Sequence, residues 1–323
     1  MSYAALPPGA PIPPPYVVFF GPKANCTLDI CPLEYSVYGY RPSLAANLTF
    51  IALYAIAAVI HAYLGFRWKQ WWFMGCMLVG AVNAILGYVG RVMLYYNPFN
   101  FNAFMLQIIC VSTGPVYYCA AIYITLALSI NHLSPSLSRF QPKLFYYIFI
   151  PCDILSLILQ AAGGGLSTSS SGQSQVGVDL ALAGLSFQVF TILLFCGFFI
   201  DYLVRYFGDS SSHRRGGDGG DNLNRTDTTI DATRLRLFFG FMVLAVLLTL
   251  ARCAFRLAEL HQGWLSGGLI REEGLFIGLE GVIILTAVFC LMIGHPGLVF
   301  KPERKDGVIA GQSQQEMQEY DSK

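Results

Sequence analysis

The residues of this chain best suited to chemistry are ionisable side chains set inside long apolar segments. Arg252, Arg256 and Glu259 are four and three residues apart, so a helix would carry all three on one face. Two guanidinium groups on one face repel each other unless anions meet them. We expect these anions to be Glu259, Glu280 or Asp153, or the head group of a bound ligand.

A second polar stripe lies near the middle of the chain. Asp153, Ser156 and Gln160 are spaced to share one face of a helix, and such a face points into the interior of a helix bundle. A charged side chain at the centre of a membrane helix costs about 2.5–3.5 kcal/mol, so it needs a partner, water or a ligand. Hydrogen bonds between helices, and arginines that reach lipid phosphates, are the purely structural alternatives.

We predict that the polar residues inside the apolar segments form a ligand-binding set. Its members are Arg91, Gln107, Asp153, Gln160, Gln188, Arg252, Arg256, Glu259 and Glu280. An anionic head group would meet the arginines, and a cationic amine would meet the carboxylates. The sequence does not choose between these two ligands.

The sequence lacks the motifs of several other functional classes. It has no Gly-Lys dipeptide, hence no phosphate-binding loop for nucleotides, and no G-x-S-x-G nucleophile elbow. Its five histidines form no H-x-x-x-H pair, and its net charge of +1 indicates no nucleic-acid partner. We therefore expect no catalytic residues, no metal site and no cofactor, and we do not expect an enzyme.

Helices must position the polar residues, because 55% of the chain is hydrophobic and only 12% is charged. The apolar residues fall in blocks long enough to cross a hydrocarbon core of about 30 Å at about 1.5 Å per residue. We predict an all-α membrane protein, a bundle of seven transmembrane helices. The predicted helices cover residues 43–65, 71–94, 103–128, 143–164, 178–205, 235–258 and 274–294.

The distribution of lysine and arginine predicts the orientation of the bundle. Fourteen of these residues lie on one side of the predicted helices and three on the other, which places the first side in the cytoplasm. We thus expect an extracellular N-terminal segment (1–42), the membrane domain (43–299) and a cytoplasmic C-terminal tail (300–323). A polar stretch (208–233) reads as a disordered cytoplasmic loop. In this orientation most of the buried polar residues lie in the outer half of the membrane.

The N-terminal segment carries two features of an extracellular compartment. Asn25 begins an Asn-Cys-Thr glycosylation sequon. Cys26 and Cys31 are candidates for a disulfide, since this compartment is oxidising; two free thiols are the alternative.

The order of several short motifs resembles one family, the fungal lipid-translocating exporters. These seven-span proteins are associated with resistance to toxic amphiphiles and with export of sphingoid long-chain bases. The resemblance covers about Tyr40 to Gly297. The matching motifs are Arg41-Pro42-Ser43-Leu44-Ala45-Ala46-Asn47, His61, Gly87-Tyr88-Val89-Gly90-Arg91, Gln107, Gly114-Pro115, Tyr123, Asp153-x-x-Ser156-x-x-x-Gln160, Gly184-x-x-x-Gln188, Arg252-x-x-Phe255-Arg256-x-x-Glu259, Gly263, Glu273, Glu280 and His295-Pro296-Gly297.

The resemblance implies a transporter of lipids or other amphiphiles, in the plasma membrane, whose partners are membrane lipids. It names no protein partner and no nucleotide. Two alternatives stay open. A seven-helix receptor for an amphiphilic ligand fits the same topology, and an intramembrane hydrolase would use Asp153 or Glu280 with a metal.

Overall fold

The computed structural model describes residues 18–22, 24–133, 141–169, 175–215, 232–262 and 271–299, and within these ranges it contains helices and no strand. Seven helical segments are long and apolar enough to span a membrane, as predicted. The first six spans are α1 (Leu44–Trp68), α2 (Trp71–Tyr96), α3 (Phe101–Leu133), α4 (Pro142–Ser169), α5 (Gln175–Arg215) and α6 (Ala232–Gln262).

The seventh span, Glu273–Val299, is built from four short elements. They are α7 (Glu273–Leu275), η4 (Phe276–Val282), α8 (Ile283–Ile293) and α9 (Pro296–Val299). The η4 stretch is a π-helix, in which each turn takes up more residues than an α-turn. Such turns are uncommon and often occur at functional sites.

Several helices are longer than the sequence predicted. α3 continues to Leu133 and α5 to Arg215, so α5 passes Gly208, where the cytoplasmic loop was expected to begin. The predicted helix ends came too early because they followed apolar content alone, and the polar last turns of a helix resemble a loop in the sequence. The rest of the expected loop, 216–231, and the tail, 300–323, lie outside the described residues.

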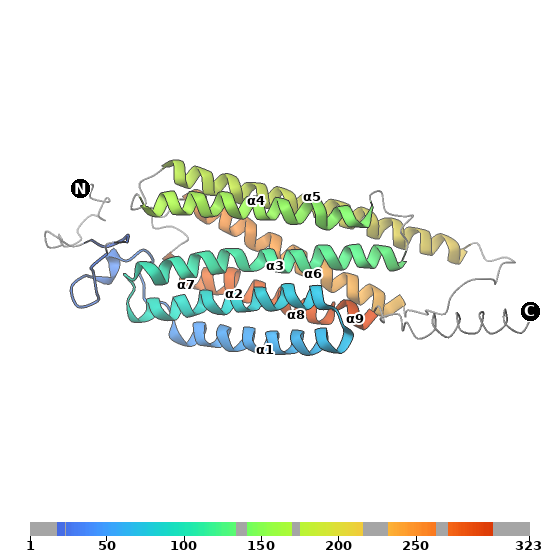
Figure 1. Cartoon of the computed structure of the whole chain (residues 1–323), viewed down its shortest axis with the longest axis horizontal. Coiled ribbons are helices and arrows are strands. Elements are labelled where there is room, and N and C mark those ends of the chain that lie inside the picture. The colour runs from blue at the N-terminus through green and yellow to red at the C-terminus, as the bar shows by residue number, and fades with distance from the viewer. Residues whose placement is uncertain are drawn as a thin grey trace, which may run out of the picture.

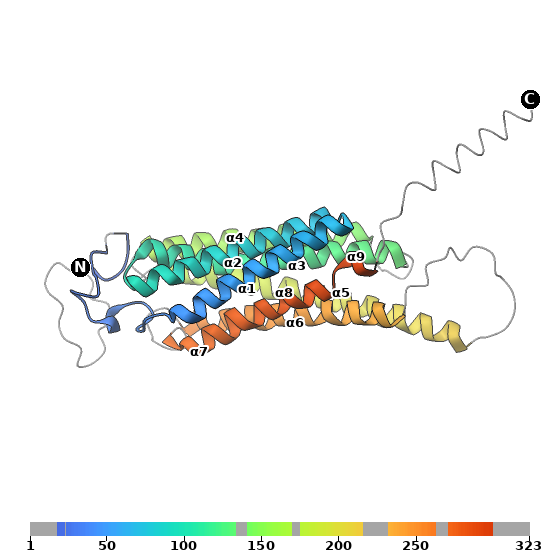
Figure 2. The same cartoon turned by 90° about the horizontal axis from the view of Figure 1, so that it is seen from below.

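The spans pack as a closed ring in chain order. Each helix from α1 to α6 contacts the next, α6 contacts α8, and α8 contacts α1, while α3 also reaches across to α6 (Figures 1 and 2). α3 is the most buried of the seven spans. It therefore presents side chains to both halves of the ring.

The segment before α1 lies across one end of α2 and α3, beyond the helices (Figures 1 and 2). It contains a short 3₁₀ helix, η1 (Leu33–Tyr35), and a disulfide between Cys26 and Cys31. This disulfide packs against Phe99 in the α2–α3 turn. Phe20 meets the ring of Phe104 at a centroid distance of 5.2 Å. The packing fixes this segment over the bundle end that holds most of the polar residues.

Glycine allows α5 to lie close against the polar stripe of α4. A Cβ atom at Gly184 would lie 2.8 Å from the carbonyl oxygen of Ser156 and 3.0 Å from the backbone nitrogen of Gln160. Small residues of this kind let membrane helices approach closely. Gly197, on the same helix, has open space around its Cβ position.

We predict that Gly184→Leu destabilises the bundle and that Gly197→Leu does not. The first change forces α4 and α5 apart, at a cost of about 1–3 kcal/mol or more for overpacking. Thermal unfolding of the purified protein in detergent measures the difference. Equal midpoints for the two variants would contradict the close approach at Gly184.

Candidate functional site

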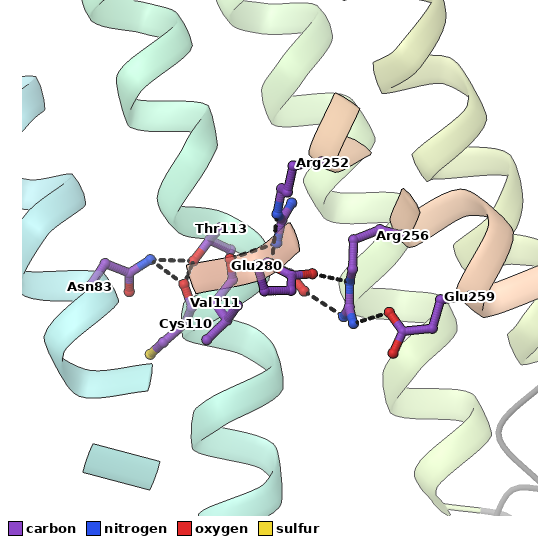
Figure 3. Close-up of polar contacts among 9 residues, drawn as sticks. Asn83, Cys110, Val111, Thr113, Arg252, Arg256, Glu259 and Glu280 are labelled. Carbon is purple, nitrogen blue, oxygen red and sulfur yellow. Dashed lines mark hydrogen bonds and ion pairs between the residues drawn. The ribbon is translucent and has the colours of Figure 1, made fainter. Parts of the chain in front are cut away.

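The centre of the candidate site is a chain of buried ion pairs between α6 and η4 (Figure 3). Arg252 Nε lies 2.9 Å from Glu280 Oε2, and Arg256 Nε lies 3.1 Å from Glu280 Oε1. Arg256 Nη1 then donates to Glu259 Oε2 at 2.7 Å. The predicted arginine face exists, and two carboxylates neutralise its two guanidinium groups.

A proline in α3 supplies a further acceptor to this chain. Pro115 has no backbone N–H, so the carbonyl group of Val111, four residues earlier, has no partner within the helix. Arg252 Nη2 donates to this carbonyl oxygen at 2.8 Å (Figure 3). Next to it, Ser112 Oγ accepts from Arg256 Nη2 at 3.2 Å. The helix defect at Pro115 thus becomes a binding site for a guanidinium group.

The same part of α3 is held from its other side by α2. Asn83 Nδ2 donates to the carbonyl oxygen of Cys110 at 3.0 Å and contacts the hydroxyl of Thr113 (Figure 3). Sequence reasoning missed Asn83, although an amide inside an apolar helix is a usable signal. Its role is to fix the α3 backbone that receives Arg252.

Arg91 forms a separate cluster near the end of the bundle that the N-terminal segment covers. Its guanidinium carbon lies 3.8 Å from the centre of the Phe276 ring, and its Nη2 donates to Tyr40 Oη at 3.1 Å. Glu273 Oε1 is 3.9 Å away. Glu273 also accepts from the backbone nitrogen of Ser43, which begins α1. Arg91 therefore joins α2 to the start of α1 and to the seventh span.

Gln107 is bound by the N-terminal segment. Tyr38 Oη donates to Gln107 Oε1, and the tyrosine is buried. Burial raises the pKa of Tyr38 above its ordinary value, so the hydroxyl stays protonated and remains a donor. Nothing in the sequence around Tyr38 and Tyr40 had indicated these two contacts.

Asp153 lies apart from all the arginines. Its Oδ2 accepts from Tyr123 Oη at 3.0 Å, its Oδ1 lies 3.4 Å from Thr191 Oγ1, and the residue is 1% exposed. Its pairing with Arg252 or Arg256, one of the expected arrangements, does not occur. Among the described residues no salt bridge involves Asp153.

The two predicted glutamines of α4 and α5 lie close to Asp153. Gln160 Nε2 donates to Gln188 Oε1 at 3.0 Å, as expected for neighbouring interior faces. Thr191 Oγ1 lies between this pair and Asp153, and it donates its one proton to the carbonyl oxygen of Gln188 at 2.8 Å. The polar stripe of α4 faces the interior, with Ser156 fully buried.

The predicted ligand-binding set therefore forms three clusters and not one continuous surface. They surround Glu280, Arg91 and Asp153. A small cavity beside Glu280, lined by Tyr54, Tyr88 and Tyr118, offers about 10 Å³, which is at the lower limit for a single water molecule. An amphiphile head group does not fit in this cavity.

The described residues contain no group of three histidine, cysteine or acidic side chains placed to hold a metal ion. Asn25 is exposed in the N-terminal segment, where its Oδ1 accepts from the backbone nitrogen of Val18 at 2.9 Å. Both glycosylation at this residue and ligand binding by the three clusters remain predictions.

Comparison with known proteins identifies relatives over most of the chain. A family model described as RTA1 like protein matches residues 77–303. The sphingoid long-chain base transporter RSB1 of Saccharomyces cerevisiae (strain Lalvin EC1118 / Prise de mousse) is 32% identical over 288 residues, which is 82% of this chain and 75% of the relative.

Two further relatives have lower sequence identity and are also named for transport or uptake. The protoporphyrin uptake protein 1 of Saccharomyces cerevisiae is 27% identical over 67% of this chain and 66% of its own. The probable lipid transporter atnI of Emericella nidulans is 24% identical over 82% of this chain and 68% of its own. No solved structure matches the chain.

We predict that Glu280→Gln destabilises the protein more than Arg252→Met. The first change removes the carboxylate shared by two arginines, whereas after the second Glu280 still pairs with Arg256. Breaking a buried ion pair costs about 3–5 kcal/mol, and thermal unfolding in detergent measures it.

A surface pair provides the control for this comparison. Arg205 and Asp201 form an ion pair whose side chains are 39% and 37% exposed, so Arg205→Met should cost only about 0–1 kcal/mol. Additive effects of Glu280→Gln and Arg252→Met in the double variant would contradict the coupling described above.

Proposed function

Because this chain belongs to the RTA1 like protein family, we propose that it transports a lipid with a cationic head group, of the sphingoid long-chain base class, across the membrane. A relative that covers most of the chain is named for this substrate. The structural observation that supports a cationic head group is the carboxylate of Asp153, which forms no salt bridge among the described residues.

The charges of the clusters around Glu280 and Asp153 favour a cation over an anion as the ligand at these two clusters. Arg252 and Arg256 are matched by Glu259 and Glu280, so this cluster has no positive charge left for an anionic head group. Asp153 accepts from the hydroxyl of Tyr123 and has no basic partner among the described residues. An ionised carboxylate without a cation is costly inside a membrane, and the ammonium group of a sphingoid base would neutralise it.

The surroundings of Asp153 also suit the rest of such a ligand. Tyr123, which donates to Asp153, packs against Phe195 at a centroid distance of 4.5 Å and against Phe149 at 5.4 Å. Aromatic faces attract an ammonium group, and they also pack well against an alkyl chain. These rings come from α3, α4 and α5.

Transport requires a second conformation in which the lipid reaches Asp153. The described helices are irregular at Pro115 of α3, at Pro151 of α4 and at the π-helix η4. Pro115 and η4 adjoin the Glu280 cluster. We infer that this cluster holds the bundle closed and that Asp153 binds the lipid, so the two sites have different roles.

We further propose that the N-terminus faces outward and the C-terminus faces the cytoplasm of a plasma-membrane protein. The fourteen-to-three distribution of basic residues supports this orientation. The disulfide in the N-terminal segment supports it too, since disulfides persist in oxidising compartments.

A receptor for an amphiphile is the alternative from another class, and the transport and uptake names of the relatives do not favour it. We also propose that the chain is not an enzyme. Lipid exchange in a reconstituted system distinguishes transport from both other classes.

We predict that Asp153→Asn lowers transport of a labelled sphingoid base by about tenfold or more. The loss removes a charge-assisted contact worth about 1.5–3 kcal/mol, while the amide keeps the shape of the side chain. Movement of the base between leaflets of liposomes containing the purified protein gives the rate, with protein-free liposomes as the baseline.

Two controls sharpen this test. Asp179→Asn, an exposed acid on α5, should transport normally. An N-acetylated base, which has no positive charge, should be transported poorly by the unchanged protein. Normal transport by a folded Asp153→Asn variant would refute the assignment of the head-group site.

We predict that an epitope tag inserted at Ser170 is accessible on intact cells and that a tag at Gly217 is accessible only after permeabilisation. Antibody labelling with and without detergent measures this. Labelling of the Gly217 tag on intact cells would reverse the proposed orientation.

A further inference from the structure

Two buried histidines lie together at the opposite end of the bundle from the Arg91 cluster. His61 of α1 is 1% exposed and His295, between α8 and α9, is 0% exposed. Both rings pack against Phe73 of α2, with centroid distances of 5.9 and 4.9 Å. None of the three clusters described above includes either histidine.

The hydrogen bonds of these rings fix their protonation pattern. His295 Nδ1 accepts from the backbone nitrogen of Gly297 at 3.1 Å, so its proton lies on Nε2. His61 Nε2 lies 3.3 Å from the carbonyl oxygen of Val288. A carbonyl oxygen only accepts, so His61 carries its proton on Nε2 and a lone pair on Nδ1.

Each histidine is left with one buried nitrogen that has no hydrogen-bond partner among the described residues. They are Nδ1 of His61, an acceptor, and Nε2 of His295, a donor. An unsatisfied buried polar atom costs about 1–3 kcal/mol, and a water molecule, which can donate to one nitrogen and accept from the other, removes both costs.

We propose that His61 and His295 form a proton-binding site, bridged by one water molecule, and that proton uptake there is coupled to lipid movement. The coupling rests on the proposed transport function. An imidazole with a free lone pair can accept a proton, but burial disfavours the charged ring, so uptake requires this end of the bundle to open to water. Proton uptake at this pair would couple transport to a proton gradient, a source of energy that the three clusters around Glu280, Arg91 and Asp153 do not provide.

The charges around the pair favour reversible binding of a proton. The ends of α1 and α6 near the pair carry Arg67, Lys69, Arg234 and Arg236, all exposed. α1, α2, α8 and α9 contain no acidic residue. Because none of the described residues of these four helices carries a carboxylate, none of them would trap an added proton as a permanent ion pair.

Protonation also has a structural consequence at this end of the bundle. A proton on the free His61 Nδ1 leaves the hydrogen bond of Gly297 intact, whereas a proton on His295 Nδ1 removes the acceptor for the backbone N–H of Gly297, the second residue of α9. Gly297 lies against the side chain of Trp68 at the end of α1, too close for a Cβ atom. Loss of the hydrogen bond would loosen α9 from α1, and so connect the proton to a movement between the first and seventh spans.

The test uses the full-length protein in liposomes with a pH-sensitive dye inside and a labelled sphingoid base. Exchange is measured first at equal pH and then with a gradient of about two pH units, which can drive accumulation up to about 100-fold per coupled proton. Comparison with protein-free liposomes removes the passive response of the amine to pH.

The decisive variant is His61→Gln combined with His295→Asn. Glutamine keeps a donor for the Val288 carbonyl group, and asparagine keeps a cap for α9, but neither side chain takes up a proton. His132→Gln, on the exposed end of α3, is the control. If the double variant does not fold, His295→Asn alone replaces it.

We expect the unchanged protein and the His132→Gln control to accumulate lipid with the gradient and to move protons with it. The double variant should lose both responses and keep exchange at equal pH. Unchanged accumulation in the double variant would overturn the proposal. So would normal exchange by the unchanged protein with no response to the gradient, which leaves the transport function standing. Absence of exchange at equal pH would refute the transport function itself, and the coupling with it.

Discussion

An ionised group in a membrane interior must find its counter-charge within the protein, and this requirement organises the bundle. Arg252 is buried and Arg256 is partly buried, and their partners come from α6 itself, from η4 and from α3. The α3 contact exists because Pro115 leaves the carbonyl group of Val111 unpaired. A residue that weakens one helix thereby ties three spans together, and the rest of the ring closes around that junction.

The same requirement separates the polar residues by role. Residues whose charges are matched, such as Arg252 and Glu280, need no ligand for their stability. Asp153 is buried among hydroxyl groups and aromatic rings and has no such match. The histidine pair differs again, because one nitrogen of each ring has no hydrogen-bond partner among the described residues. We propose that head-group binding, closure and proton uptake fall to different parts of one bundle.

The number of spans and most of the buried polar residues could be predicted, because the cost of polar atoms in a membrane shows directly in the sequence. The inward stripe of Asp153, Ser156 and Gln160 followed from helical spacing alone. Pairing across helices could not be predicted in this way. Glu280 was one of several possible partners for Arg252, and only the packing of α6 against η4 selected it.

Contacts made by the N-terminal segment were also beyond sequence reasoning. Tyr38 and Tyr40 lie in an irregular stretch without periodicity, so nothing indicated that they would reach Gln107 and Arg91. The helix ends in α3 and α5 were predicted too early for a related reason, since hydropathy reports the apolar core of a span and not its polar last turns.

The π-helix that carries Glu280 is equivalent to one residue inserted into an α-helix. Such an insertion can migrate along a helix by exchanging hydrogen bonds one at a time, without unfolding either end. Passage of the bulge past Glu280 would rotate this side chain by about 100°, the turn of one helical residue, and would withdraw it from both arginines at once. Such a shift in the seventh span would release the junction on which the other helices close.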